Sequence, residues 1–230
     1  MGTLTFHGHA CTEIRTDDGT RLLIDPWLTD NALADVGPEA FHDDLDFVLF
    51  THGHFDHTGD GYDILRRSGA TLIASFELVS YAQNEEGVEN AHPMHIGGGF
   101  DFPFGRVKMT PALHGGQVAG ENGGPYSTFP AGFLLTLGDT TIYHAGDTAL
   151  LKDMELLRGQ VDVALLPIGD NFTMGPEDAA RAVGMIEPDR VVPIHYDTFE
   201  LIEQDPAEFR RLVGKASKVV VLEPGESLEF

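Results

Sequence analysis

The first quarter of the chain alternates apolar and polar residues in short runs separated by turn residues. Runs at residues 3–7, 12–15 and 21–25 each predict a β-strand, and polar residues 16–19 between the last two predict a tight turn. A further short apolar run covers residues 46–50. The first three runs are therefore expected to form a β-meander, and residues 46–50 a further short strand.

Beyond residue 50 the pattern changes to apolar strands that alternate with amphipathic helices. A helix is expected at residues 60–67, with Gly69 as its end, and a second at residues 75–84, with Ser75 as its cap. The buried strand 71–74 lies between them. Residues 85–105 are rich in Gly, Pro and His, so this segment is expected to be mostly loop.

The second half of the chain repeats this strand and helix pattern. A strand at 106–111 precedes a hairpin, which is followed by three helix and strand pairs; the expected ranges are 131–137 and 140–143 for the hairpin, 148–157, 176–186 and 206–213 for helices, and 161–167, 190–194 and 218–222 for strands. Two similar halves with helices outside predict an α/β protein with a four-layer αββα sandwich. We expect a single domain over residues 1–230.

The composition narrows the range of partners. With 14 basic and 37 acidic residues, the net charge of −23 repels polyanions, so long nucleic acid is excluded as a partner and a small-molecule substrate is favoured. The single cysteine, Cys11, forms no intrachain disulfide, which favours a reducing compartment, and the absence of a long apolar run argues against membrane insertion. We expect a cytoplasmic protein, and a homo-oligomer is compatible with these features.

The clearest chemical pattern is the sequence at residues 51–57, directly after an apolar strand. Its candidate ligands are four side chains within six residues, and Gly53 lets the backbone approach closely; the four are His52, His54, Asp56 and His57. Imidazole nitrogens and carboxylate oxygens suit divalent cations. The alternative, a hydrogen-bonded histidine cluster without metal, is disfavoured because unpaired buried imidazoles and carboxylates are costly.

This loop alone cannot close a metal site, so distant partners are expected. Three further residues each follow a predicted β-segment, so each is expected at the same edge of the sheet. They are His114, Asp147 and His195. Taken singly, each of the three has an alternative role, since a polar residue at a strand end often only satisfies backbone groups. Together with the loop they complete a set of ligands.

The sequence HGHFDH resembles the HxHxDH signature of the metallo-β-lactamase superfamily. By this resemblance, His52, His54 and His114 would hold one metal, Asp56, His57 and His195 the other, and Asp147 would bridge both. The cofactor implied is therefore two divalent metal ions per chain. The nitrogen and oxygen ligands favour zinc or manganese, and iron is also compatible.

A closer resemblance extends along the whole chain, through FHGHAC, IDPWLT, HGHFDHTGD, HPMHIGG, IYHAGDTAL, LLPIGDNFTMGPEDA and VVPIHYDTF. These segments are similar to a bacterial and archaeal family of metal-dependent hydrolases, which is related to ascorbate phosphate lactonases and N-acylphosphatidylethanolamine phospholipases D. The resemblance implies a hydrolase and leaves the substrate open.

Two cations roughly 3.5–4 Å apart lower the pKa of a shared water, so that hydroxide is available near neutral pH. We favour a small-molecule phosphodiester as substrate, with a carboxylic ester or lactone as the alternative. A redox di-iron protein and a non-catalytic binding module are less favoured classes. Asp56 is expected to orient the hydroxide and His7 to protonate the leaving group, although His7 equally fits a core role.

Other residues are expected to support the site or to contact the substrate. These are His144, three residues before Asp147, Asn171 ahead of a predicted helix, and Tyr196 directly after His195. The Gly-rich residues 115–130 are expected to form a functional loop that shapes the pocket. His9 and His42 carry no functional pattern.

Overall fold

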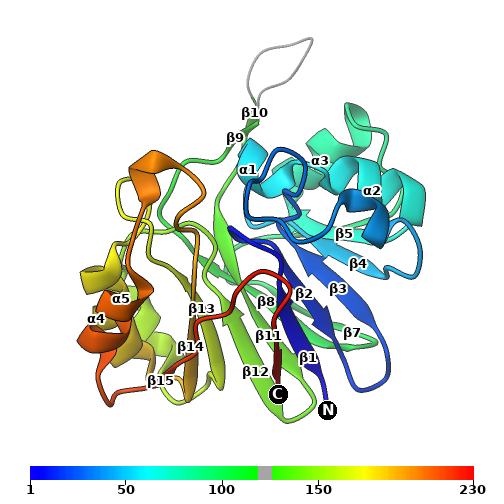
Figure 1. Cartoon of the computed structure of the whole chain (residues 1–230). Coiled ribbons are helices and arrows are strands. Elements are labelled where there is room, and N and C mark those ends of the chain that lie inside the picture. The colour runs from blue at the N-terminus through cyan, green and yellow to red at the C-terminus, as the bar shows by residue number, and fades with distance from the viewer. Residues whose placement is uncertain (119–125) are drawn as a thin grey trace.

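The computed structural model describes residues 1–118 and 126–230, and its frame is a pair of β-sheets that face each other (Figure 1). The first sheet has the order β16-β1-β2-β3-β4-β5-β6. Its strands are β1 (Thr3–Phe6), β2 (Thr12–Arg15), β3 (Arg21–Ile24), β4 (Phe47–Leu49), β5 (Thr71–Ser75), β6 (Ala91–Met94) and β16 (Ser227–Glu229). The meander predicted from the sequence is the antiparallel part, β1 to β3.

The second sheet has the order β15-β14-β13-β12-β11-β8-β7. Its strands are β7 (Gly99–Phe102), β8 (Gly105–Pro111), β11 (Ala131–Leu137), β12 (Thr140–His144), β13 (Val163–Pro167), β14 (Arg190–Ile194) and β15 (Lys218–Val219). The strands from β12 to β15 are parallel. A separate two-stranded ribbon joins β9 (Gln117–Val118) and β10 (Tyr126–Ser127).

Helices cover both outer faces. The helices α2 (Gly61–Ser68) and α3 (Phe76–Asn84) lie on the first sheet, whereas α4 (Pro176–Ile186) and α5 (Pro206–Val213) lie on the second (Figure 1). The central core joins apolar residues of both sheets, such as Ile14 and Ile24 from one and Phe133 and Leu165 from the other. This arrangement confirms the predicted α/β four-layer αββα sandwich.

Local sequence explains where several helices begin and end. Gly69 ends α2 in a left-handed conformation with φ 72°, which a residue without a Cβ adopts at little cost. At the start of α5, the Asp205 carboxylate accepts a hydrogen bond from the backbone N–H of Ala207, and Pro206 occupies the first turn. In both cases the predicted boundary is confirmed.

Other elements differ from the sequence prediction. The helix predicted at residues 148–157 is reduced to a 3-10 helix, η2 (Lys152–Leu157). Residues 148–151 are non-helical, because the Ala149 N–H donates to Leu113 and the Thr148 carbonyl accepts from Met174. The predicted loop 85–105 contains β6 and β7, two edge strands with mostly exposed or half-exposed side chains and therefore little apolar periodicity. Short unpredicted elements are η1 (Pro38–Phe41), α1 (Phe55–Thr58), η3 (Glu200–Ile202) and β16.

The segments that follow β4, β12 and β14 meet at one edge of the sandwich, opposite the two chain termini (Figure 1). This convergence follows from the parallel strand pairs, whose carboxyl ends share an edge. Among the helices of the described chain, none has the length and hydropathy needed to span a bilayer.

Candidate metal centre

The histidine-rich segment after β4 lies at the centre of this edge. His54 directly precedes α1, and this single helical turn carries Asp56 and His57. Gly53 approaches the β9 segment so closely that an added Cβ would lie 2.3 Å from a methyl carbon of Val118. The close backbone approach predicted for Gly53 is therefore present.

One group of candidate ligands is purely histidine. His52, His54 and His114 each place a ring nitrogen within 4.8 Å of the others. The His52 Nε2 and His54 Nδ1 atoms lie 3.0 Å apart, and the His114 ring centroid lies 5.1 Å from that of His52 and 5.0 Å from that of His54. The structure therefore brings together the three residues that the resemblance assigns to one metal.

Asp147 lies between this group and a second one. Its Oδ2 atom is 3.0 Å from His195 Nε2 and 3.4 Å from both His57 Nε2 and His114 Nε2. A carboxylate next to histidines of both groups is in position to bridge two cations. Asp147 is only 3% exposed, and a buried carboxylate charge is costly unless nearby groups such as these histidines or a cation compensate it.

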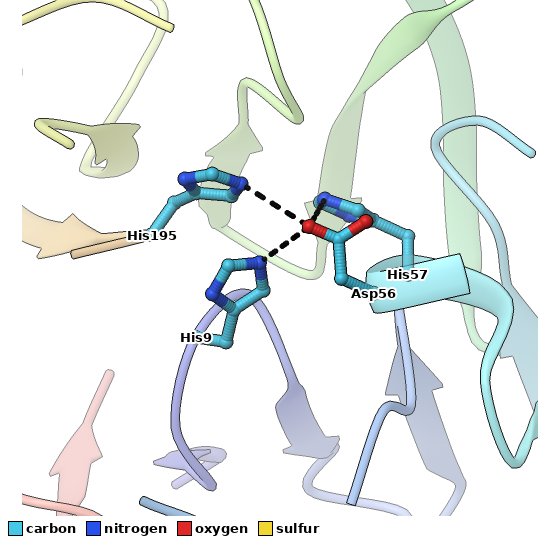
Figure 2. A group of neighbouring side chains, drawn as sticks. All are labelled: His9, Asp56, His57 and His195. Atoms are coloured by element: carbon cyan, nitrogen blue, oxygen red, sulfur yellow. Dashed lines mark hydrogen bonds and ion pairs between the residues drawn. The ribbon is translucent and has the colours of Figure 1, made fainter. Parts of the chain in front are cut away.

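The second group surrounds Asp56, and Figure 2 shows His9, His57 and His195 converging on its carboxylate. Asp56 Oδ2 lies 3.1 Å from His9 Nε2, 3.8 Å from His195 Nε2 and 4.0 Å from His57 Nε2. The Nε2–H group of His9 donates to this carboxylate, so the His9 Nδ1 atom accepts from the Thr198 hydroxyl at 2.5 Å. The tautomer and orientation of His9 are thereby fixed.

His9 is a site residue that the sequence analysis missed. It follows Gly8 just beyond a predicted strand, the same criterion that selected His114, Asp147 and His195, and would have been found by applying that criterion throughout. Its backbone adopts φ 56°, as does that of His195, whose N–H donates to the His9 carbonyl at 2.7 Å. Left-handed backbone at residues other than glycine is uncommon and gathers at functional sites.

Asp25 is a second residue that was not singled out from the sequence. Its fully buried carboxylate accepts hydrogen bonds from His57 Nδ1 at 2.8 Å, from the Thr51 N–H at 2.8 Å and from the Thr51 hydroxyl at 2.6 Å. The contact with His57 leaves Nε2 of that ring directed toward Asp147. A carboxylate behind a histidine is a common way to orient a metal ligand.

Several buried ligand atoms fit a metal better than they fit the protein alone. His57 Nε2, both ring nitrogens of His195 and Asp147 Oδ1 have no hydrogen-bond partner within the described part of the chain. Unpaired buried polar atoms are costly, and cations at this position would satisfy His57 Nε2, His195 Nε2 and Asp147 Oδ1. The nitrogen and oxygen donors therefore fit divalent cations of the zinc or manganese type.

The electrostatics agree with this fit. Burial lowers the pKa of His52 well below its usual value and also lowers that of His54 and His114, so these rings favour the neutral form that binds metal. Against the effect of burial, the Asp147 carboxylate raises the pKa of His195 to about 9. In the absence of metal, a proton on His195 therefore partly neutralises the buried Asp147 carboxylate.

The other predicted residues lie away from the ligand atoms. His144 is buried behind the site, where its Nε2–H donates to the Ala10 carbonyl at 3.2 Å and its Nδ1 accepts from the N–H of Gly146. These contacts hold the segment that carries Asp147. Tyr196 packs against the outer apolar cluster, and Asn171 is exposed with φ 39°; neither lines the pocket over the candidate ligands.

His7 is not brought into this cluster. Its Nδ1 lies 2.8 Å from Asp35 Oδ1 and its Nε2 lies 3.4 Å from Glu13 Oε2, so both ring nitrogens face carboxylates. Its ring also packs edge-on against Phe41. The leaving-group role expected for His7 stays a prediction, and these contacts favour the alternative role of a core residue.

A pocket of about 500 Å³ opens above the candidate ligands. Its lining combines ligand side chains with large apolar ones: His54, Phe55, Asp56, His114, Asp147, Phe172, His195, Phe199 and Leu201. The expectation that residues 115–130 shape this pocket falls partly on residues 119–125, outside the described residues. The volume is in the range of sites for small molecules.

Comparison with known proteins agrees with the geometry. A family profile described as "Beta-lactamase superfamily domain" matches residues 20–196, a span that contains all of the predicted metal ligands. A protein named UPF0173 metal-dependent hydrolase from Heliobacterium modesticaldum is 49% identical over 98% of this chain and 96% of its own. The chain belongs to this family of metal-dependent hydrolases. A member from Anoxybacillus flavithermus is 47% identical over 99% of each chain.

The likeness of this hydrolase to known structures is equally extensive. Igni18, described as a novel metallo hydrolase from the hyperthermophilic archaeon Ignicoccus hospitalis, superposes with a TM-score of 0.85 at 34% identity. The match covers 100% of this chain and 99% of that one. The resemblance to metallo-β-lactamase-fold hydrolases drawn from the HGHFDH motif is thus confirmed.

His7 provides a test through the pH dependence of stability. Burial opposes its charge, but Glu13 and Asp35 raise the pKa of His7 above 6.5, so its stabilising contribution is complete below about 6.5 and is lost as pH rises through the raised pKa. Despite burial, contact with His7 lowers the pKa of Glu13 from 4.5 to about 2. The contribution of Glu13 to folding stability is therefore present above pH 4.5 and is lost as the pH falls toward 2. We expect His7→Gln to destabilise the hydrolase more at about pH 6 than at about pH 9.

Urea unfolding of the two proteins at equal metal content measures this difference, with exposed His95→Gln as the control. Turnover of an alkyl ester and a nitrophenyl ester gives the second readout. A general acid would show a loss of about 10²–10⁴-fold that shrinks with the better leaving group. An equal loss on both esters, together with the pH-dependent destabilisation, would leave His7 with a structural role only.

Proposed function

We propose that this protein uses two divalent cations to hydrolyse an ester bond in a small molecule. The observation that carries the proposal is the position of Asp147, whose Oδ2 atom lies 3.0–3.4 Å from histidine nitrogens of both ligand groups. His52, His54 and His114 would hold one cation, Asp56, His57 and His195 the other, and Asp147 would contact both. When bound, such cations would supply an activated water and polarise the substrate oxygen.

The protein's own contribution is to fix the polar groups around the reacting bond. Asp56 lines the pocket and is held by His9, so its carboxylate is in position to accept a hydrogen bond from an attacking water. Asp25 and Thr198 lock the rings of His57 and His9 from behind. Such preorganised polar groups lower the cost of reorganisation during the reaction.

The pocket favours a carboxylic ester or lactone as the bond that is cleaved. Among the described residues that line it, none is a lysine or arginine, the side chains that usually pair with phosphate oxygens. The net charge of −23 also disfavours an anionic substrate. A phosphodiester is the second candidate, supported by the complete set of metal ligands, since a dimetal site can act on phosphorus as well.

Metal content is the direct test of this proposal. After reconstitution with Zn²⁺ or Mn²⁺ at neutral pH and removal of free metal, elemental analysis should find about two ions per chain. The loaded protein should then cleave members of a chromogenic panel of esters, lactones and phosphodiesters, with the uncharged substrates preferred. Absence of tightly bound metal, or a loaded protein that cleaves none of the panel, would refute the proposal.

We propose that the reaction takes place in the cytoplasm, because the single cysteine of the sequence cannot form an intrachain disulfide. Cys11 is free and fully buried, and burial raises its pKa well above the usual value of a thiol. A chain without disulfides suits a reducing compartment.

A further inference from the structure

The pocket above the candidate metal centre has a polar floor and an apolar wall. Candidate ligands form the floor, and Phe55, Phe172, Phe199 and Leu201 form the wall. These four residues, called the apolar wall below, come from α1, from the segment before α4 and from the segment around η3. The wall therefore exists only because the fold brings three distant segments to the same edge.

The apolar wall is open to solvent. Phe55 is 66% exposed, Phe172 51% and Leu201 66%, whereas Phe199 is half-buried. A single exposed apolar residue is ordinary on a protein surface, and Leu156 on η2, which is 74% exposed, is an example. A group of large apolar side chains around a concave site is different, because such patches usually mark a binding surface.

Part of the apolar wall is held rigidly from behind. The buried Trp27 ring stacks on Phe199, with centroids 5.4 Å apart and planes at 21°, and packs edge-on against Phe55 at 5.8 Å. Phe199 in turn packs against His9, which contacts Asp56. The wall is thus preformed next to the reacting centre, which lowers the entropy cost of binding an apolar group there.

We infer that the substrate carries an uncharged apolar acyl or aryl group beside the bond that is cleaved, and that this group lies on the apolar wall. The choice of a small molecule as the occupant follows from the continuity of the wall with the ligand floor within one pocket of about 500 Å³. The absence of lysine and arginine from the described lining and the net charge of −23 favour an uncharged group. The inference rests on the proposed function for the nature of the bond and for the metal ions beside it.

Two hydroxamates with the same metal-binding head and different tails test this inference without any need for turnover. Acetohydroxamate and octanohydroxamate are titrated into the zinc-loaded protein, and binding is followed by calorimetry and by the fluorescence of Trp27, the sole tryptophan of the sequence. Complete burial of a methylene is worth roughly 4-fold in affinity, so six added methylenes on an open wall should give at least about 30-fold tighter binding.

Variants of the wall locate the tail. Leu201→Ala and Phe172→Ala should each lower the ratio of the two affinities by about 5-fold or more, because apolar contact with the tail is lost. Leu156→Ala is the matched control, since this exposed leucine lines a different hollow, on η2. It should leave the ratio unchanged.

Several results would overturn the inference. They are failure of both hydroxamates to bind the zinc-loaded protein, equal affinity for both tails, and a preference for the long tail that survives both wall variants. If Leu201→Ala instead lowers the molecular mass in solution and the tail preference is absent, the wall is an interface between copies of the chain. A clear tail preference without hydrolysis of any ester would support the apolar wall and refute only the proposed function.

Discussion

Asp147→Asn should abolish hydrolysis and lower the bound metal from about two ions per chain to about one or fewer. Asparagine keeps the volume of the side chain and removes the charge that faces His57, His114 and His195. Metal ions contribute several kcal/mol of transition-state stabilisation, and each 1.4 kcal/mol is about tenfold in rate, so we expect a loss of at least about 10³-fold.

Elemental analysis after dialysis and turnover on the best substrate of the panel measure this effect. Asp139→Asn is the matched control, because Asp139 is exposed in the turn between β11 and β12 and the same change there should leave the fold intact. Circular dichroism should show that both variants keep the fold. Wild-type metal content together with wild-type turnover in Asp147→Asn would contradict the bridging assignment.

Asp25→Ala should produce the largest loss of stability. The change leaves the N–H and hydroxyl of Thr51 and the Nδ1–H of His57 without their buried acceptor. Removal of one partner from a buried ion pair typically costs about 3–5 kcal/mol, and loss of a carboxylate that orients a ligand typically lowers metal affinity about 10–100-fold. Both effects are expected here.

Asp25→Asn separates orientation from folding. Asn suits the left-handed backbone of residue 25, with φ 49°, and can still accept from the Thr51 N–H, so the loss of stability should be smaller than for alanine. With its oxygen on the Thr51 N–H, its NH2 group faces the Thr51 hydroxyl and His57 Nδ1 and accepts from neither, so metal affinity should still fall. Asp30→Asn, with φ 61° at an exposed site, is the control. Unchanged metal affinity in Asp25→Asn would show that Asp25 does not orient His57.

The predicted elements that agree best with the structure are those defined by residues close together in the sequence. Strands such as β11 and β12 around Gly138 and helices such as α4 are set by periodicity, turn residues and capping, so their boundaries could be predicted to within a few residues. The edge strands β7 and β16 were missed because their short sequences acquire strand structure only through pairing with β8 and β1.

The site shows the same division between local and distant information. The four candidate ligands of residues 51–57 could be predicted from their spacing alone, because a short loop places neighbouring side chains around one point. His9 and Asp25 are less clearly indicated by the sequence, because their contacts join distant positions. His9 contacts Asp56 across 47 positions of sequence, and Asp25 contacts His57 across 32. The placement of His7 against Asp35 and Glu13 was likewise decided by packing.

By itself, the sequence determined the layered α/β fold and predicted the types of metal-binding side chain and a small-molecule partner, because periodicity, donor chemistry and net charge are properties of the chain. Only the tertiary structure decided which polar residues surround Asp147 and that Phe55, Phe172 and Leu201 share one pocket wall. The physical reason is that carboxyl ends of separate strands meet at one sheet edge, so side chains far apart in sequence become neighbours only after both sheets have packed together.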